Sequence, residues 1–265
     1  MNRESLNVFS LYDDRSWLYD AAFSWDPEDE AAWLVERLGP GVHSILEPGC
    51  GSGRLFPAFA RRGIAIAGVD VSAAMLERAR ERMRSASLPL PLLVRAHMAE
   101  FDLGAHVDGA VCPINTFAYL PTVYAARCHL ASVRRHLGAG GRYLVQLDIR
   151  SVAPFRLLPA DDVTCWEVDS PRGRLRCSWF GVAFDHDRRI ETEVSRFELV
   201  SGPDAGYTFE DRHEMRVWDW AEWTALVSGP HFRQAAAHDG NSRAPLDLGP
   251  SLEGRPLVWH ELVAV

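Results

Sequence analysis

The first half of the chain alternates short apolar runs with stretches of amphipathic, helix-type periodicity. The apolar runs predict buried strands at residues 43–47, 64–70, 92–96, 108–112 and 141–149. The amphipathic stretches predict helices at residues 27–39, 52–63, 72–85 and 122–138. Regular alternation of strands and helices predicts a parallel sheet with helices on both faces.

The pattern changes after Asp148. Strand-like stretches, separated by turn sequences, predict an antiparallel meander at residues 163–168, 175–184, 188–200 and 207–218. A predicted helix at residues 218–229 and an apolar strand at residues 255–265 follow. The expected fold class is therefore α/β, a doubly wound Rossmann-like sheet with an antiparallel β-sheet inserted after its fifth strand.

The composition is that of a globular protein, and it excludes several classes of function. Of the 265 residues, 47% are hydrophobic and 24% are charged, and the net charge is -8. An acidic chain lacks the basic face that a phosphate backbone requires, so we expect no nucleic-acid partner. The chain contains no lysine, which excludes Schiff-base chemistry, pyridoxal phosphate anchoring and the Walker lysine.

The sequence predicts neither a membrane span nor a metal site. The longest apolar stretches are far too short for a bilayer, and the first residues lack the apolar core of a secretion signal, so we expect a cytoplasmic protein. The five cysteines are scattered, and no His, Cys, Asp or Glu cluster has metal-ligand spacing. Heavy use of Ala, Arg, Gly and Asp fits a GC-rich genome, and we expect a bacterial source.

Three alternate glycines, Gly49, Gly51 and Gly53, follow the first predicted strand. A strand, a glycine-rich turn and a helix together present backbone N–H groups to a ligand. A dinucleotide fingerprint would place its third glycine at position 54, where this chain has Arg54. Asp70 ends the second strand nineteen residues after Gly51, where an acid can bind two ribose hydroxyls. The spacing favours a nucleoside with an amino-acid tail.

Three stretches resemble successive motifs of class I S-adenosylmethionine-dependent methyltransferases: LEPGCGSGRL (46–55), GVDVSAAML (68–76) and HMAEF (97–101). The inserted sheet is similar to that of small-molecule members, especially bacterial aminosugar N-methyltransferases and the glycine N-methyltransferase group. The resemblance implies in-line methyl transfer from S-adenosylmethionine to a nitrogen or oxygen of a small molecule.

The resemblance also implies a set of residues that bind the methyl donor. Glu47, Gly49 and Gly51 would line its methionine part, and Asp70 would hold the ribose hydroxyls. The full set is Tyr19, Glu47, Gly49, Cys50, Gly51, Gly53, Arg54, Asp70, Val71, Met75, His97, Met98 and Asn115.

Some members of this set have a second interpretation. Val71 and Met75 would flank the adenine, but Met75 fits the core equally well. Cys50 fits as a small filler beside the donor. Met98 matches an adenine-side position, and His97 stands where the family often has an aspartate that accepts from the adenine amino group.

For the methyl acceptor, the expected site lies beyond the carboxyl ends of the fourth and fifth strands. The resemblance to the aminosugar group implies two catalytic residues: Tyr119, which would orient the nucleophile, and Tyr19, which would approach the sulfonium. The expected substrate-binding residues are Asn115, Tyr119, Asp148 and His213. Packing is the alternative for both tyrosines, and strand alternation leaves a solvated position open for His213.

The expected organisation has four parts: an N-terminal helical lid at 1–40, a cofactor-binding core at 41–150, the inserted sheet at 151–217 and a C-terminal helix with strands at 218–265. The inserted sheet is expected to cover the substrate or to pair two subunits as a homodimer. Two other functions stay open. One is a protein of this fold that binds the cofactor without methyl transfer, and the other is a methyltransferase of a macromolecule.

Overall fold

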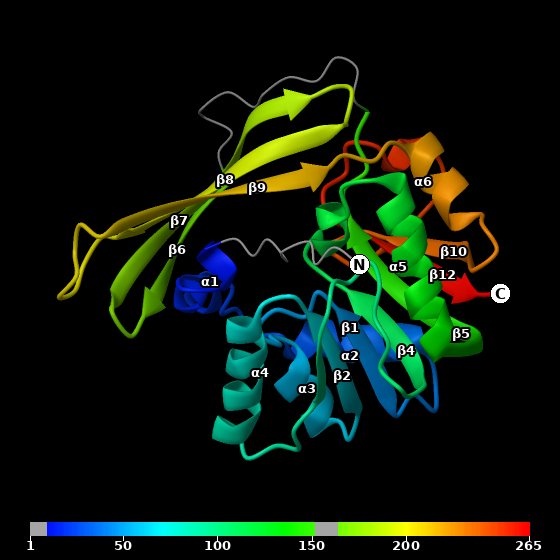
Figure 1. The fold of residues 1–265 in the computed structure, drawn as a ribbon, viewed down its shortest axis with the longest axis horizontal. Helices are drawn as coiled ribbons and strands as arrows, with labels where there is room; N and C mark the ends of the chain where they lie inside the picture. Colours follow the sequence, from blue (N-terminus) through cyan, green and yellow to red (C-terminus); the bar gives the residue numbers. More distant parts are fainter. Residues whose placement is uncertain (1–9, 152–163) are drawn as a thin grey trace, which may run out of the picture.

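The computed structural model describes residues 10–151 and 164–265, which form two sheets and the helices around them (Figure 1). The strands are β1 (Ser44–Pro48), β2 (Ala65–Asp70), β3 (Leu92–Arg95), β4 (Val107–Cys112), β5 (Leu137–Leu147), β6 (Thr164–Ser170), β7 (Gly173–Asp185), β8 (Ile190–Leu199), β9 (Thr208–Arg216), β10 (Phe232–His238), β11 (Pro245–Leu246) and β12 (Val258–Ala264). The α-helices are α1 (Ser16–Ala22), α2 (Glu28–Leu38), α3 (Phe56–Arg61), α4 (Ala73–Ser85), α5 (Val123–His136) and α6 (Trp220–Val227). Short 3₁₀ helices are η1 (Ser10–Tyr12), η2 (Thr116–Tyr119) and η4 (Pro250–Leu252).

The central sheet has the strand order β11-β10-β12-β5-β4-β1-β2-β3. Strands β1 to β5 pair in parallel, whereas β12 runs antiparallel to both β5 and β10. The prediction of a doubly wound Rossmann-like sheet is confirmed. The sequence pattern missed β10 and β11, because the FRQAAAH stretch of β10 has three alanines where strands favour branched or aromatic residues.

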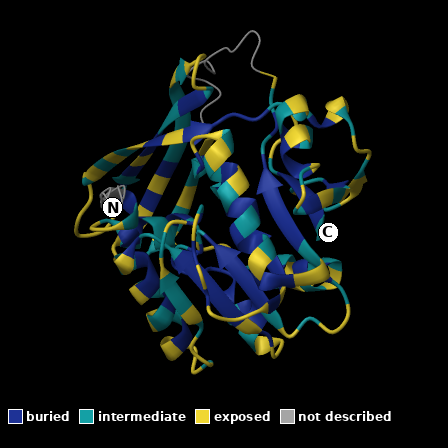
Figure 2. Cartoon of the chain, turned by 45° about the vertical axis from the view of Figure 1, so that its right-hand side comes forward, coloured by how far each residue is buried: buried dark blue, intermediate teal, exposed yellow. Residues whose placement is uncertain are grey.

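Helices cover both faces of this sheet. Ile45 and Leu46 are neighbours in β1, yet they belong to different apolar clusters because successive strand residues point to opposite faces. Ile45 packs with α2, α3 and α4, and Leu46 with α5 and α6. In Figure 2 the central strands are buried, and exposed positions lie on the outer turns of the helices.

Polar side chains fix the start of three helices. Ser72, Thr122 and Asp219 cap α4, α5 and α6, and each side-chain oxygen accepts a hydrogen bond of 2.7–3.0 Å from the backbone N–H three residues later. Of the helices in residues 10–151 and 164–265, none is both long enough and apolar enough to cross a membrane.

The antiparallel sheet, in the order β6-β7-β8-β9, follows β5 in the chain, as predicted. It projects from the core, with α1 lying close to β6 and β7 (Figure 1). Leu11, Leu18 and Ala22 pack against its inner face at Cys177 and Phe197. Residues 1–9 of the predicted lid and 152–163 of the predicted insertion lie outside the described residues.

Candidate active site

The glycine turn joins β1 to α3. Gly49, Gly51 and Gly53 all have positive φ, +70°, +52° and +66°, a region that only glycine adopts without strain. The N–H groups of Gly49 and Cys50 donate to the carbonyl of Val69 at 2.7 and 3.0 Å, which ties the turn to the end of β2. The backbone geometry therefore requires glycine here whatever the turn binds.

The surroundings of the three glycines differ. A Cβ on the first would lie 2.4 Å from Cγ2 of Thr116, and one on the third 2.4 Å from the ring of Phe56. A Cβ on Gly51 would meet only Cε1 of Tyr19, at 3.8 Å. The first and third glycines thus allow the protein to pack closely, whereas the middle one lies beside open space next to Tyr19.

Asp70 faces this turn from the end of β2. Its Oδ2 accepts from the N–H of Gly51 and its Oδ1 from the N–H of Ser72, both at 2.8 Å. Burial raises the pKa of the carboxyl group, and these backbone donors partly offset that rise. The two motifs that the sequence paired by spacing are therefore in direct contact.

Glu47 and Arg54 flank the turn with incomplete hydrogen bonding. Glu47 is 4% exposed, and its Oε2 has no hydrogen-bond partner among the described residues. Burial raises its pKa to about 8. Arg54 donates from Nη2 to both carboxylate oxygens of Glu30, but its buried Nε and Nη1 lack a partner within the described chain.

Such orphaned buried groups are costly unless a ligand pairs with them. The ammonium and carboxylate of an amino-acid tail match this carboxylate and this guanidinium in charge. The residues present therefore fit the methionine end of S-adenosylmethionine.

The predicted adenine side is less uniform. Met75 is fully buried, Val71 is partly exposed, and Met98 lies close enough that a Cβ on Gly49 would be 3.4 Å from its Sδ. His97 is exposed, and its Nδ1 accepts from the N–H of Ala99 at 3.0 Å. The buried Cys50 packs on β2, because its Sγ would lie 2.8 Å from a Cβ on Gly68.

The loop after β4 is strained and braced. Ile114 and Asn115 both have positive φ, +55° and +57°. Asparagine adopts this region more readily than most residues, but it is unusual for the β-branched Ile114. Asn115 Oδ1 accepts from the N–H of Asp148 at 3.1 Å, and Gln146 Oε1 accepts from the N–H of Ile114 at 2.8 Å. The Asp148 carboxylate in turn accepts from the N–H of Leu257. The predicted residues Asn115 and Asp148 thus meet, and both hold backbone in place.

A chain of polar side chains crosses from the core to the inserted sheet. The hydroxyls of Tyr12 and Tyr119 are 2.7 Å apart, and Tyr119 Oη is 3.1 Å from Nδ1 of His213. Nε2 of His213 lies 2.8 Å from Oγ of Ser195. Burial raises the pKa of Tyr119 and lowers that of His213 to about 4, so the chain is neutral at pH 7. His213 is fully buried, which rules out the solvated alternative.

Tyr19 connects the two parts of the site. Its ring centroid is 5.4 Å from that of Tyr12, and it is the residue next to Gly51. Three residues of the site were not predicted from the sequence: Tyr12, Ser195 and Gln146. Tyr12 and Ser195 come together with Tyr119 only through contacts between distant segments, for which the sequence carries no local signal.

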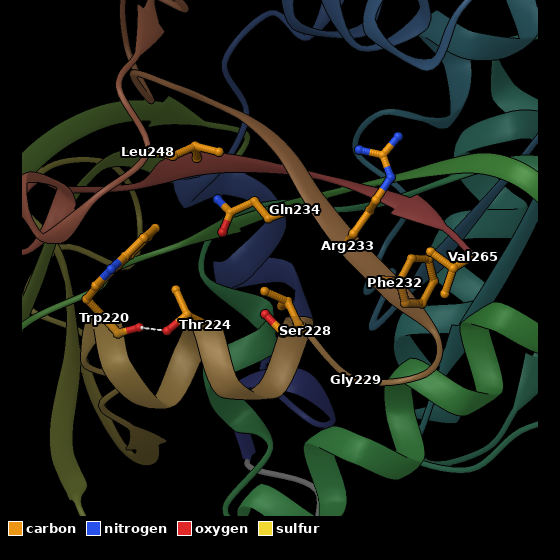
Figure 3. Close-up of a pocket in the computed structure, with 10 residues that line it drawn as sticks. Trp220, Thr224, Ser228, Gly229, Phe232, Arg233, Gln234, Leu248 and Val265 are labelled. Atoms are coloured by element: carbon orange, nitrogen blue, oxygen red, sulfur yellow. Dashed lines mark hydrogen bonds between the residues drawn. The ribbon is translucent and has the colours of Figure 1, made fainter.

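Two cavities lie elsewhere. One, of about 360 Å³, lies between α6 and β10 and is lined by Trp220, Thr224 and Gln234 among others (Figure 3). The other, of about 310 Å³, includes Asp20 of α1 and Arg78 of α4. Neither contains a predicted site residue. In residues 10–151 and 164–265, no three His, Cys, Asp or Glu side chains gather as metal ligands would.

Comparison with known proteins agrees with this geometry. Residues 45–141 match a family model described as a methyltransferase domain. A dTDP-4-amino-2,3,4,6-tetradeoxy-D-glucose N,N-dimethyltransferase of Saccharopolyspora spinosa is 30% identical over 149 residues, 54% of this chain and 57% of that protein. A dTDP-3-amino-3,4,6-trideoxy-alpha-D-glucopyranose N,N-dimethyltransferase of Streptomyces venezuelae is 29% identical, covering 89% of this chain and 97% of that protein.

The fold is also similar to that of solved methyltransferase structures. The SAM-bound structure of CalS10, an amino pentose methyltransferase of Micromonospora echinaspora, matches with a TM-score of 0.73 at 20% identity, covering 100% of both chains. The glycine turn and the paired Asp70 lie within residues 45–141, the part of the chain that matches the methyltransferase domain, and the chain resembles S-adenosylmethionine-dependent methyltransferases of small molecules.

Proposed function

We propose that this protein transfers a methyl group from S-adenosylmethionine to an amine nitrogen of a small molecule, with an aminosugar as the acceptor class. Binding of the methyl donor is supported by one observation: Glu47 and Arg54 have buried polar atoms without a partner among the described residues, beside the open side of Gly51. The acceptor class follows the two relatives, both of which are named as aminosugar N,N-dimethyltransferases.

On the donor side, each residue has a definite task. Glu47 binds the ammonium of the methionine part, and the free donors of Arg54 bind its carboxylate. Gly51 lets the ligand approach the turn, and Asp70 accepts from the ribose hydroxyls. The rest of the expected set, Gly49, Cys50, Gly53, Val71, Met75, His97 and Met98, shapes the turn and the adenine side.

On the acceptor side, the protein aligns the acceptor with the methyl group and excludes water from the reaction. The bound donor supplies an activated methyl group on a sulfonium. Tyr19 lies where an aromatic ring or hydroxyl can face that cation, and Tyr119 orients the acceptor from the end of the η2 turn. Asn115 and Asp148 act through the backbone that they brace, and His213 holds the hydroxyl of Tyr119. Residues 10–22 and the inserted sheet exclude water from the displacement.

The proposal is tested by turnover. The protein is incubated with S-adenosylmethionine and dTDP-3-amino-3,4,6-trideoxy-α-D-glucopyranose, together with a panel of small amines, and release of S-adenosylhomocysteine is measured. The matched control replaces each amine by the corresponding alcohol. Release with amines and not with alcohols is expected. Release with alcohols alone would make the protein an O-methyltransferase, and binding of S-adenosylmethionine without release would leave a cofactor-binding protein.

A further inference from the structure

Glu193 lies on the inner face of the inserted sheet, on β8, which pairs with β7 and β9. On β8 it lies on the same face as Glu191 and Ser195, because residues two apart on a strand share a face. It pairs in register with His213 of β9 and Gly181 of β7. The register of β7 shifts between Gly181 and Ala183, an irregularity that is common next to active sites because it re-aims side chains. A Cβ at position 181 would lie 2.4 Å from Oε1 of Glu191, so the glycine makes space for the carboxylate that neighbours Glu193 on this face.

The contacts of Glu193 tie it to the tyrosine chain. Its Oε2 accepts a hydrogen bond from Nε1 of Trp179. The indole of Trp179 stacks on the ring of His213, with centroids 4.6 Å apart and planes 20° apart. His213 in turn contacts Tyr119. Glu193 itself is partly exposed, whereas His213 is fully buried, so the carboxylate stands at the accessible edge of this network.

The charges that face Glu193 leave it without a cation of its own. Arg150, at the end of β5, is bonded to Glu191. Asp148 at the same strand end adds negative charge, and the chain of Tyr119 and His213 is neutral. The remaining nearby acid, Asp211 of β9, accepts from the N–H of Leu11 at 2.7 Å. Burial, Glu191 and Asp148 together raise the pKa of Glu193 to about 7 despite Trp179 and Arg150, which act in the opposite direction.

We propose that Glu193 is the catalytic carboxylate that binds the ammonium group of the methyl acceptor and removes its proton. The assignment rests on the proposed function and adds the residue that makes the nitrogen nucleophilic. A carboxylate that holds a proton near neutral pH is matched to this task, because it accepts the proton readily and returns it to water. Glu193 was not predicted from the sequence, because the pattern of the inserted strands does not show which face is inward.

Deprotonation of the acceptor precedes the methyl transfer. The acceptor R–NH₃⁺ gives one proton to the Glu193 carboxylate and becomes R–NH₂. The nitrogen lone pair forms a bond to the methyl carbon while the carbon–sulfur bond breaks, and that electron pair stays on the sulfur. The products are R–NH₂CH₃⁺ and a neutral thioether. Glu193 then releases its proton to water, and a second transfer would begin with R–NH₂CH₃⁺ giving up a proton to the same carboxylate.

Glu193→Gln tests the assignment, because the amide oxygen still accepts from Trp179 and the fold is preserved. With the amine that the wild type methylates, kcat/KM at neutral pH is expected to fall about 100-fold. The wild-type rate should rise with pH through about 7 as Glu193 loses its proton. This rising limb of the pH–rate profile should disappear in the variant. Calorimetric binding of the same amine to the S-adenosylhomocysteine complex should weaken, while the affinity for S-adenosylhomocysteine itself stays unchanged.

Glu210→Gln is the matched control, since Glu210 is exposed on the outer face of the adjacent strand and pairs with Arg196. It should leave rate and pH profile unaltered. If Glu193→Gln also keeps both the rate and the limb while amines are turned over, the assignment is overturned and the proposed function stands. If the wild type binds S-adenosylmethionine but methylates no amine, the proposed function fails and the assignment fails with it.

Discussion

The donor side and the acceptor side of the site are held together in different ways. On the donor side, Asp70 binds the N–H of Gly51, only 19 residues away, and the contact involves backbone. On the acceptor side, side chains meet over long separations, 107 residues between Tyr12 and Tyr119 and 94 between Tyr119 and His213. The contact on the donor side therefore forms within one strand–turn–helix–strand unit. The contacts on the acceptor side form only when the N-terminal segment, the core and the inserted sheet are packed together.

The two sides also differ in their titratable groups. The donor side holds a buried carboxylate on Glu47, whose pKa burial raises to about 8. The tyrosine chain of the acceptor side is neutral, with the pKa of His213 lowered to about 4. In the proposed function the donor brings its ammonium to Glu47, and the acceptor brings its ammonium to Glu193 beside the neutral tyrosine chain. Changes on the donor side should act on donor affinity, and changes in the tyrosine chain should act on turnover.

The largest expected effect is that of Gly51→Val. The valine side chain would fill the space beside Tyr19 that the methyl donor needs, so binding of S-adenosylmethionine should fall below detection in calorimetry. Gly63→Val is the matched control, because Gly63 also has positive φ, +75°, but has nothing within 4 Å of its Cβ position. Both variants should lose stability from backbone strain. Equal donor affinity in the two would contradict a ligand at Gly51.

Asp70→Ala should weaken donor binding by about 2–4 kcal/mol, the range for hydrogen bonds to a charged group. The change should also destabilise the fold, because Asp70 holds the N–H groups of Gly51 and Ser72. We expect an additional loss of about 1–3 kcal/mol in the free energy of unfolding. Urea unfolding and calorimetry measure the two effects separately.

Asp108 provides the control for that experiment. Its carboxylate accepts from the N–H of His43 at 2.9 Å and from Oγ of Ser44 at 2.8 Å, at the opposite end of the sheet. Asp108→Ala should therefore reduce stability and leave donor affinity unchanged. A similar loss of affinity in both variants would mean that Asp70 acts through the fold alone.

Glu47→Gln should weaken donor binding by about 1.5–3 kcal/mol and change its pH dependence. The folded-state pKa of Glu47, about 8, lies above its ordinary value of 4.5, so between these values the folded state binds more protons than the unfolded state. Stability from this group is thus present below 4.5 and is lost as pH rises through 8. The glutamine variant should lack this loss and exceed wild-type stability in alkaline solution.

The same carboxylate links donor binding to protons. A bound ammonium favours the charged form of Glu47, so the wild type should release a proton on binding at neutral pH. Calorimetry in two buffers of different ionisation enthalpy detects that release. Wild-type binding without proton release would mean that binding does not change the protonation state of Glu47.

The sequence predicts contacts between neighbouring strands better than contacts between distant segments. The contact of Asp70 with Gly51 was predictable, because both residues stand at the ends of strands whose pattern is local. The meeting of Asn115 and Asp148 was predictable for the same reason, since parallel strands end at one edge of the sheet. Their hydrogen bonds to backbone were not, because they depend on the positive φ of residues 114 and 115.

The acceptor side was largely unpredictable, for a physical reason. The sequence around His213 reads Asp-Arg-His-Glu, so both faces of β9 are polar and the alternation does not say which one is inward. Packing of the inner face against Leu11 and Leu18 decides it, and those residues lie about 200 positions earlier in the chain, as the Leu11–Asp211 contact records. The same packing decides the position of Glu193.

The smallest expected effect tests whether residues 10–22 act as a lid, and Tyr12→Phe is the probe. The change removes one hydroxyl from the chain to Tyr119 while keeping the ring next to Tyr19. We expect kcat to fall about fivefold, equivalent to a net hydrogen bond of about 1 kcal/mol, with donor affinity unchanged. Tyr124→Phe, at a tyrosine that is 78% exposed on α5, is the control and should leave kcat unaltered.

Hydrogen exchange separates a moving lid from a docked helix. Leu11, Leu18 and Ala22 are fully buried against the inserted sheet, and Asp20 binds Arg78 and Arg82 of α4, so the segment joins the sheet to the core. A lid should gain protection over residues 11–22 when S-adenosylmethionine binds, and Tyr12→Phe should reduce that gain. Equal protection with and without the donor would mean that the segment is permanently docked. The tyrosine chain would then be a fixed wall of the acceptor site, because the contacts that hold it do not depend on the ligand.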